Sequence, residues 1–266
     1  MPIGDSFYAN SKSATAGIFF KLFGTPDLHT HLRLRPMLHF LAQYFRENKN
    51  KLIEVLEPGC GGGINAFELL KISERCGKTL HYTGVDMNDK EIAKAELLCS
   101  RLGKGRVLDF RHDDAITFLK GAEASTADIV VLADIIEHVE KPSELIDAAY
   151  RCLRPGGLFA VSVPTPLYSK IFGKRFHDRI GHVIDGYTLE SLDRLFVDSR
   201  GCTRVCYRHN TGFLSNVGCW LYYNVLDFKS KNINNIKSVV LYPFTLMDFY
   251  NSSSVSCTLF AVYRKE

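Results

Sequence analysis

The feature that most constrains the fold of this chain is a glycine-rich turn at the end of a short apolar run. Residues 55 to 63 read Val-Leu-Glu-Pro-Gly-Cys-Gly-Gly-Gly, and the residues beyond them are typical of a helix. Glycines leave bare backbone that a polar ligand can approach, and a helix N-terminus adds unpaired N–H groups and the positive end of a dipole. The pattern predicts a strand, a ligand-binding loop and a helix in succession.

The spacing of the glycines separates two ligands that such a loop can hold. The dinucleotide-binding pattern G-x-G-x-x-G needs a glycine at position 64, where this chain has Ile64. The observed pattern is E-x-G-x-G-x-G, formed by Glu57, Gly59, Gly61 and Gly63. A carboxylate at the loop entrance repels a diphosphate and favours a ligand that carries an ammonium and a sulfonium. For this motif taken alone, a purely structural turn is the alternative.

The E-x-G-x-G-x-G pattern resembles the first motif of class I S-adenosylmethionine-dependent methyltransferases. The resemblance implies that Glu57 and the glycine backbone hold the amino-acid end of S-adenosyl-L-methionine. Asp86 and Met87 close the next strand-like run and are similar to the family's second motif, in which the carboxylate accepts two ribose hydroxyls. We place both residues in the cofactor site. Taken alone, an aspartate at a strand end more often caps a helix.

A third element follows the next strand-like run at Asp114-Ala115. It resembles the Asp-Ala pair of these methyltransferases, in which the carboxylate meets the adenine amino group and the next backbone N–H meets a ring nitrogen. Asp113 takes this role if the register of the strand shifts by one residue. The structural alternative for Asp114 is to cap the helix that follows.

A fourth element is the apolar run that ends at Asp134, which suits a central parallel strand covered on both faces. Asp134 is expected to line the pocket near the methyl group. Glu137-His138-Val139, just beyond, is typical of the methyltransferase subgroup that includes the ubiquinone-biosynthesis O-methyltransferases. The Leu-Arg-Pro-Gly-Gly sequence of residues 153–157, before another apolar strand, is a signature of the same fold.

Alternating strands and helices predict an α/β fold with a doubly wound parallel sheet. The resemblance implies a Rossmann-like, seven-stranded sheet of order 3-2-1-4-5-7-6, with strand 7 antiparallel and insertions after strands 5 and 6. We expect residues 1–50 to form an N-terminal helical cap and residues 51–163 the S-adenosylmethionine-binding core. Residues 164–266 would add an acceptor loop, an insertion and the C-terminal strands of the same domain.

Composition limits the partners and the compartment. A net charge of +4 does not by itself indicate nucleic-acid binding, so we expect no nucleic-acid partner. The eight cysteines form no C-x-x-C pair, which favours reduced thiols in a cytoplasmic protein over disulfides or a zinc site. Asp5 stands where a signal peptide needs an apolar core, and no apolar stretch is long enough to cross a membrane.

Methyl transfer to a hydroxyl makes a chemical demand that two histidines could meet. The displacement at the sulfonium is in line, and the acceptor must lose a proton to a general base or with the help of a metal. His138, after the fourth strand, and His182, after the fifth, are the candidate catalytic residues; a structural backbone contact is the alternative for His138. Glu137 beside His138 could hold a divalent ion, but two adjacent ligands are not a site, so no metal is predicted.

Three further segments bear on the site. Residues 164–187 carry a basic cluster, which suits a phosphate, carboxylate or acidic sugar or is merely solvated. Residues 213–250 are rich in aromatic and apolar side chains, which suits core packing, a lid, a peripheral membrane contact or a homodimer contact. Apolar residues at helical spacing between Leu32 and Phe45 predict a helix over the cofactor cleft, from which Arg33 or Arg35 reaches the methionine carboxylate.

The sequence is therefore interpreted as a methyltransferase that uses S-adenosyl-L-methionine, with O-methylation of a small-molecule, sugar or lipid-linked acceptor as the first hypothesis. N- or C-methylation of a metabolite is the alternative within enzymes. A noncatalytic module of the same fold, which binds the cofactor or a partner, is the alternative outside them. The intact glycine loop and Asp86 argue against that module, because a retired pocket has no physical need for either.

Overall fold

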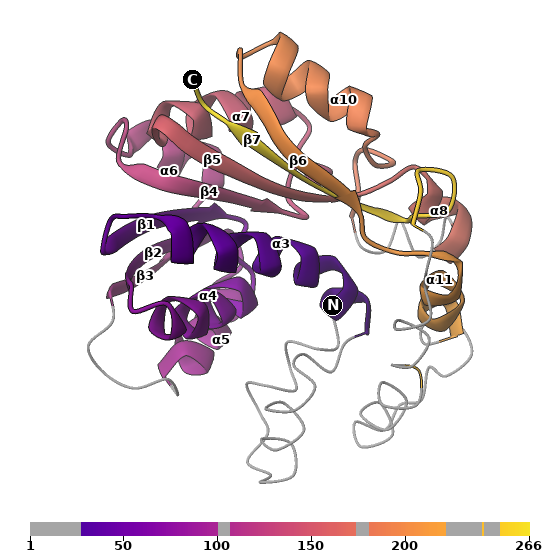
Figure 1. Cartoon of the computed structure of the whole chain (residues 1–266), viewed down its shortest axis with the longest axis horizontal. Helices are drawn as coiled ribbons and strands as arrows, with labels where there is room; N and C mark the ends of the chain where they lie inside the picture. The colour runs from indigo at the N-terminus through magenta and orange to yellow at the C-terminus, as the bar shows by residue number, and fades with distance from the viewer. Residues whose placement is uncertain (1–27, 101–106, 174–180, 222–240, 242–250) are drawn as a thin grey trace, which may run out of the picture.

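The computed structural model describes residues 28–100, 107–173, 181–221, 241 and 251–266. Within these residues, one seven-stranded sheet of order β3-β2-β1-β4-β5-β7-β6 forms the centre of the molecule (Figure 1). Its strands are β1 (Leu52–Pro58), β2 (Thr79–Asp86), β3 (Val107–His112), β4 (Ala127–Ala133), β5 (Leu153–Pro164), β6 (Thr203–His209) and β7 (Thr258–Arg264). This order confirms the topology that the resemblance implied.

The direction of the strands decides where the site lies. Strands β1 to β5 run parallel to one another, whereas β7 is antiparallel to both β5 and β6. Parallel strands end at the same edge of a sheet, where ligands of open α/β folds bind. The glycine loop after β1, Asp86 at the end of β2 and Asp134 after β4 therefore share one edge.

Helices cover the two faces of the sheet (Figure 1). Residues of three helices pack into the core on one face: α3 (Leu28–Glu47), α4 (Ile64–Arg75) and α5 (Asp89–Ser100). The other face is covered by α6 (Ala115–Gly121), α7 (Pro142–Cys152), α10 (Leu189–Asp193) and the π-helix η1 (Arg194–Asp198). The arrangement is the doubly wound α/β fold predicted from the alternation of elements.

Helix α3 is the N-terminal helix predicted from apolar spacing, and it is described from Leu28 onward. Its apolar positions Leu34, Met37, Leu41 and Phe45 are all buried in the core on the α4 side of the sheet. Burial of each such side chain stabilises the fold by roughly 1.5–3 kcal/mol. The packing fixes α3 across the sheet, so its N-terminal turns lie near the edge that carries the glycine loop.

Strand β4 is buried along its whole length, as its apolar sequence predicted. Its one charged residue, Asp128, accepts hydrogen bonds from Arg154 Nη1 at 2.7 Å and from the Glu54 backbone N–H at 2.8 Å. A buried carboxylate needs such partners. The Leu-Arg-Pro-Gly-Gly stretch, expected to precede an apolar strand, begins strand β5 itself, and the register with β4 shifts between Ala127 and Ile129.

The two predicted insertions are both present. The segment between β5 and β6 holds α8 (Leu167–Phe172) and α10, and the segment between β6 and β7 holds α11 (Phe213–Trp220). Helices α8 and α11 both contribute to a small third core. Its buried members are Leu32, Tyr168, Phe172, Cys219, Leu241 and Cys257. Residues 222–240 and 242–250 of the predicted aromatic segment lie outside the described residues. Within the described part, no helix is long and apolar enough to cross a bilayer.

Candidate active site

The glycine loop after β1 has a left-handed backbone at Gly59, Gly61 and Gly63, with φ of 73°, 50° and 75°. A Cβ at Gly59 would lie 2.6 Å from Ile135 Cδ1, and one at Gly63 would lie 2.7 Å from Ala95 Cβ. These two glycines are therefore required by close packing as well as by the turn. Around a Cβ at Gly61, no heavy atom of the described residues lies within 4 Å, so Gly61 is where the loop borders open space.

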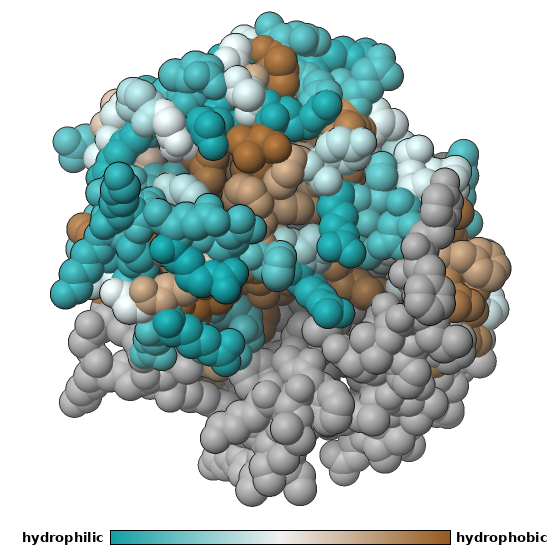
Figure 2. Space-filling view, viewed as in Figure 1, coloured by the Kyte–Doolittle hydropathy of each residue, from teal (hydrophilic) through white to brown (hydrophobic). Residues whose placement is uncertain are grey.

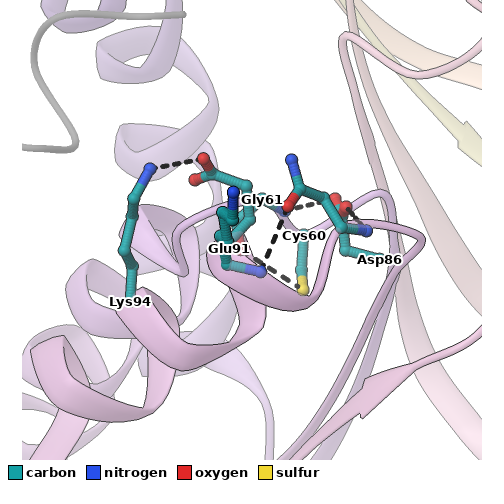
Figure 3. A network of polar contacts seen from close by, with 7 residues as sticks. Cys60, Gly61, Asp86, Glu91 and Lys94 are labelled. Carbon is teal, nitrogen blue, oxygen red and sulfur yellow. Dashed lines mark hydrogen bonds and ion pairs between the residues drawn. The ribbon is translucent and has the colours of Figure 1, made fainter.

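Asp86, at the end of β2, lies against this open part of the loop. Its Oδ2 accepts a hydrogen bond from the Gly61 backbone N–H at 2.9 Å (Figure 3). Its Oδ1 accepts one from the Asn88 N–H at 2.9 Å. A carboxylate oxygen has about two acceptor directions, so each oxygen keeps one for a further donor. The structure thus brings together the first and second motifs in a geometry that suits a ligand with neighbouring hydroxyls.

Glu57 lies beneath the loop rather than on its open side. Its side chain is 1% exposed, its Oε1 accepts from Asn65 Nδ2 at 2.5 Å, and its Oε2 accepts from the Tyr82 hydroxyl. Burial raises the pKa of Glu57 to about 7, although both donors and the Arg33 guanidinium act to lower it. The predicted contact between Glu57 and the cofactor's amino group stays a prediction.

The ends of β2 and β3 meet beside Asp86. The Asp113 backbone N–H donates to the Asp86 carbonyl at 3.2 Å, and a His112 ring nitrogen lies 3.0 Å from the Met87 carbonyl oxygen. The Met87 side chain is 71% exposed, so it stands clear of the core at the edge of this region. Its predicted place in the cofactor site is compatible with that exposure and stays a prediction.

Asp114 is the N-cap of α6, which is the structural role that the sequence left open for it. Its Oδ1 accepts a hydrogen bond from the Thr117 N–H at 2.8 Å, and this bond holds the pKa of Asp114 below its usual value. Ala115 is the first residue of α6. The capping hydrogen bond uses one oxygen of the Asp114 carboxylate. The predicted contact of Asp114 with the adenine amino group would use the other oxygen, and it stays a prediction.

Asp134 and Arg33 form an ion pair above the same edge. Asp134 follows β4 with φ of 50°, and its backbone N–H donates to the Ser162 carbonyl at 2.9 Å. Burial raises the pKa of Glu57 and Glu137, and the positive charge of Arg33 partly opposes both shifts. Of the two arginines considered from the sequence, Arg33 lies in the site and Arg35 is exposed.

The two candidate catalytic histidines lie side by side. The rings of His138 and His182 are 4.7 Å apart between centroids and meet edge to face. His138 Nδ1 lies 3.0 Å from the Gly181 carbonyl oxygen, which can only accept, so Nδ1 carries the proton. The backbone contact considered for His138 is therefore present together with the pairing. On its other side, the His182 ring is 5.6 Å from that of Tyr168 in α8.

Backbone hydrogen bonds join the loops that carry the histidines. The Glu137 carbonyl accepts from the Val183 N–H at 2.9 Å and from the Ile184 N–H at 3.1 Å. The Tyr187 hydroxyl donates to the Ile136 carbonyl at 3.0 Å. These bonds fix the loop after β5 against the loop after β4, so the pairing of His138 with His182 follows from main-chain geometry.

A methyltransferase domain family matches residues 28–207, which is more than half of the chain. The chain belongs to the class I S-adenosylmethionine-dependent methyltransferases. Membership implies S-adenosyl-L-methionine as the methyl donor.

Individual relatives of this methyltransferase are distant. A ubiquinone biosynthesis O-methyltransferase of Psychrobacter arcticus is 29% identical over 160 residues, which cover 57% of this chain and 59% of the relative. The chain thus spans less than two thirds of that relative's length. The crystal structure of a SAM-dependent methyltransferase from Archaeoglobus fulgidus has a TM-score of 0.56 at 20% identity and covers 95% of this chain and 100% of that one.

The solved neighbours show the fold without deciding the acceptor. The N-methyltransferase NodS from Bradyrhizobium japonicum, in complex with S-adenosyl-L-homocysteine, has a TM-score of 0.52 at 16% identity and covers 90% of this chain and 96% of that one. O- and N-methyltransferases thus both appear among the proteins that this methyltransferase is similar to.

Glu137 is a candidate metal ligand that the sequence prediction did not include among the site residues. Its side chain is fully buried, and burial raises the pKa of its carboxyl above the usual range. Possible ligand atoms of Glu137, His138 and His182 all lie within 4.8 Å of one another. The sequence prediction of no metal rested on two adjacent residues, and the structure adds a third from a distant loop. Of the predicted basic cluster, residues 174–180 lie outside the described residues.

Proposed function

We propose that this methyltransferase moves the methyl group of S-adenosyl-L-methionine to a hydroxyl oxygen of a small-molecule, sugar or lipid-linked acceptor. The observation that carries the proposal is the contact between the glycine loop and the loop of the histidines. Gly59 packs against Ile135, in the same short loop as His138. A donor seated on the glycine loop then lies beside the imidazole pair, as in-line transfer requires.

On the donor side, Asp86 would accept the ribose hydroxyls, and the open space at Gly61 would receive the ligand above it. Asp114 and Ala115 would meet the adenine, with Met87 beside it. Glu57, Gly59 and Gly63 would shape the amino-acid end, and Asp134 would line the pocket near the methyl group. The shared edge of β1, β2, β3 and β4 supports this distribution, because all these residues lie at or just after the C-terminal ends of these parallel strands.

On the acceptor side, His138 and His182 would together activate the hydroxyl. A hydroxyl of high pKa is a poor nucleophile until its proton leaves. The side chains of both histidines are partly exposed to solvent, and main-chain hydrogen bonds between their two loops hold them in place. This placement supports a role toward an acceptor rather than toward the core.

An acceptor with an apolar portion would suit the surroundings of His182. Helix α8 contacts His182 through Tyr168, and the same helix lines a cavity of about 320 Å³ toward α11. The cavity is lined by Leu167, Ile171, Phe213, Asn216, Val217, Trp220, Ser254 and Val255. Hydrophobic residues also reach the surface at the place of α11 (Figure 2). We include in the proposal a peripheral membrane contact through residues 213–250, with a homodimer contact there as the competing outcome.

The proposal is tested by methyl transfer in solution. The full chain is incubated with S-adenosyl-L-methionine and a panel of phenols, sugars and amines, and the methylated position is found by mass spectrometry and NMR. Asp86→Ala is expected to lower kcat/KM for the donor by at least about 10-fold, because two charge-assisted hydrogen bonds are lost. Glu123→Ala, at an exposed residue, is the charge-matched control. Methylation on oxygen supports the proposal, and methylation confined to nitrogen or carbon would contradict it.

A further inference from the structure

Three side chains that can bind a metal converge beside the donor loop. Glu137 and His138 come from the loop after β4 and His182 from the loop after β5, and the possible ligand atoms of the three lie within 4.8 Å of one another. Ligands of one zinc ion lie about 2 Å from the metal, so they are at most about 4 Å apart. A small contraction of the side chains would therefore complete the group around an ion.

The buried carboxylate is the observation that points to a ligand. The Glu137 side chain is 0% exposed, and neither of its oxygens is hydrogen-bonded to another residue in the part of the chain that the structure describes. Burying a carboxyl group without such a partner is costly, and buried charges are ordinarily paired or bound to metals. By contrast, the buried Glu57 accepts hydrogen bonds from Tyr82 and Asn65.

The orientation of His138 suits a metal ligand. Its Nδ1 proton is donated to the Gly181 carbonyl at 3.0 Å, so a neutral imidazole carries its lone pair on Nε2. Metal-bound histidines commonly donate their other ring nitrogen to a backbone carbonyl, which fixes the tautomer and the plane of the ring. Gly181 precedes His182, so one short segment supplies both the orienting carbonyl and the third ligand.

The main chain holds the group in place before any ion binds. The Glu137 carbonyl accepts two backbone hydrogen bonds from Val183 and Ile184, next to His182. The carboxylate and the two imidazoles are therefore positioned by the backbone rather than by flexible contacts. Such preorganisation is what a specific metal site requires.

We propose that Glu137, His138 and His182 bind one divalent first-row transition metal, with zinc as the reference ion. Two imidazoles and one carboxylate form a ligand set for zinc-type ions, whereas magnesium and calcium prefer oxygen ligands alone. Three protein ligands leave the fourth position of a tetrahedral ion open. The site lies at the C-terminal ends of the parallel strands, between the loop after β4 and the loop after β5. The loop after β4 packs on the glycine loop through Ile135.

The open position gives this site a role in the reaction, and that role rests on the proposed function. The acceptor hydroxyl binds the metal, which lowers the pKa of the hydroxyl and releases its proton to solvent. The oxygen then attacks the methyl carbon as the carbon–sulfur bond breaks. The electron pair of that bond remains on sulfur, which leaves as the neutral thioether S-adenosyl-L-homocysteine. His138 and His182 act as ligands in this step rather than as free bases.

Metal binding is tested directly, without an acceptor. Untagged full-length protein is stripped with a chelator and titrated with Zn²⁺ by calorimetry, and the bound metal is counted by elemental analysis. Wild type should bind one ion at this site, and Glu137→Gln, His138→Ala and His182→Ala should each weaken binding by about 100-fold or more. His81→Ala is the matched control, because His81 forms a histidine–carboxylate contact with Glu54 at 3.1 Å outside the group.

Two further readouts keep the outcomes distinct. Co²⁺ in place of Zn²⁺ gives a visible spectrum that should report nitrogen and oxygen ligands and change in His182→Ala, whereas thiolate bands would mark binding to the free cysteines. S-adenosyl-L-homocysteine should still bind Glu137→Gln, so loss of the metal and failure of the donor site are separable. Zn²⁺ affinity that is the same in wild type and all three variants would overturn the proposal.

Discussion

Arg33 of α3 and Asp134 of the loop after β4 form an ion pair that joins the N-terminal helix to the ligand-binding edge of the sheet. Their side chains are 21% and 17% exposed, so the pair is largely shielded from water. Asp134 also has a positive φ of 50°, a conformation that non-glycine residues adopt at a cost of about 1 kcal/mol or more. Strain of this kind is typical of functional sites and persists only where several contacts hold the residue.

The Arg33–Asp134 pair predicts a coupling that changes when the cofactor product binds. Urea unfolding of wild type, Arg33→Met, Asp134→Asn and the double variant should give a coupling free energy of about 1–3 kcal/mol. With saturating S-adenosyl-L-homocysteine, the coupling should fall, because the homocysteine carboxylate of the ligand competes for the guanidinium. Coupling that is unchanged by the ligand would show that Arg33 stays on Asp134 and does not bind the carboxylate.

Two glycines of the loop should respond differently to the same substitution. Gly63→Ala places a methyl group 2.7 Å from Ala95 Cβ at φ of 75°, and we expect a loss of about 2–5 kcal/mol in the free energy of unfolding. Gly61→Ala meets open space, so it should cost only about 1 kcal/mol yet weaken binding of S-adenosyl-L-homocysteine. Chemical denaturation and calorimetry measure the two effects, and equal destabilisation by both substitutions would contradict the assignment of the open side.

Glu57 predicts a fall in stability with rising pH. Burial raises its pKa from 4.5 to about 7. Between these two pH values the folded state therefore holds a proton that the unfolded state releases. The resulting stability is fully present below about pH 4.5 and is lost as the pH rises to about 7, by up to about 3 kcal/mol. Glu57→Gln should reduce this fall, as measured by urea unfolding at pH 5 and at pH 7.5. Identical pH profiles for wild type and variant would contradict the raised pKa.

Much of the fold was predictable because its signals are local. The glycine loop, the apolar strand before Asp134 and the alternation of elements lie within short windows, and parallel strands bring their ends to one edge by geometry alone. The proximity of Asp86 to Gly61 follows from that rule, and the structure confirms it at 2.9 Å. The strand order rested on the resemblance, which supplied information that the alternation of elements does not contain.

The acceptor side was less predictable because it depends on contacts between distant loops. No periodicity links His182 to Glu137, and only the backbone hydrogen bonds of Val183 and Ile184 bring the two together. The burial of Glu57 was equally hidden, since it depends on Tyr82 from the neighbouring strand reaching under the glycine loop. A polar residue that follows a central strand is a sequence signal for a site, but the sequence does not say which distant residue completes it.

The exposed aromatic side chains of α11 predict a membrane contact. Phe213 is 68% and Trp220 is 43% exposed, so replacing both with serine should leave stability within about 0.5 kcal/mol but lower the fraction bound to phosphatidylglycerol-containing vesicles by about 10-fold. Val107→Ser, at an exposed residue (53%) that begins the edge strand β3, is the control. Co-sedimentation measures binding. A wild-type dimer in light scattering that the double variant abolishes, without vesicle binding, would favour the homodimer contact instead.

The donor pocket is tested most directly by calorimetric titration of S-adenosyl-L-homocysteine into wild type, Asp86→Ala and Glu123→Ala. Asp86 joins the end of β2 to the glycine loop and offers its remaining acceptor capacity to the ribose. We expect one site per chain, an affinity weakened by at least about 10-fold in Asp86→Ala, and no change in Glu123→Ala. Absence of binding to wild type, or equal affinity of wild type and Asp86→Ala, would contradict the assignment of the donor pocket.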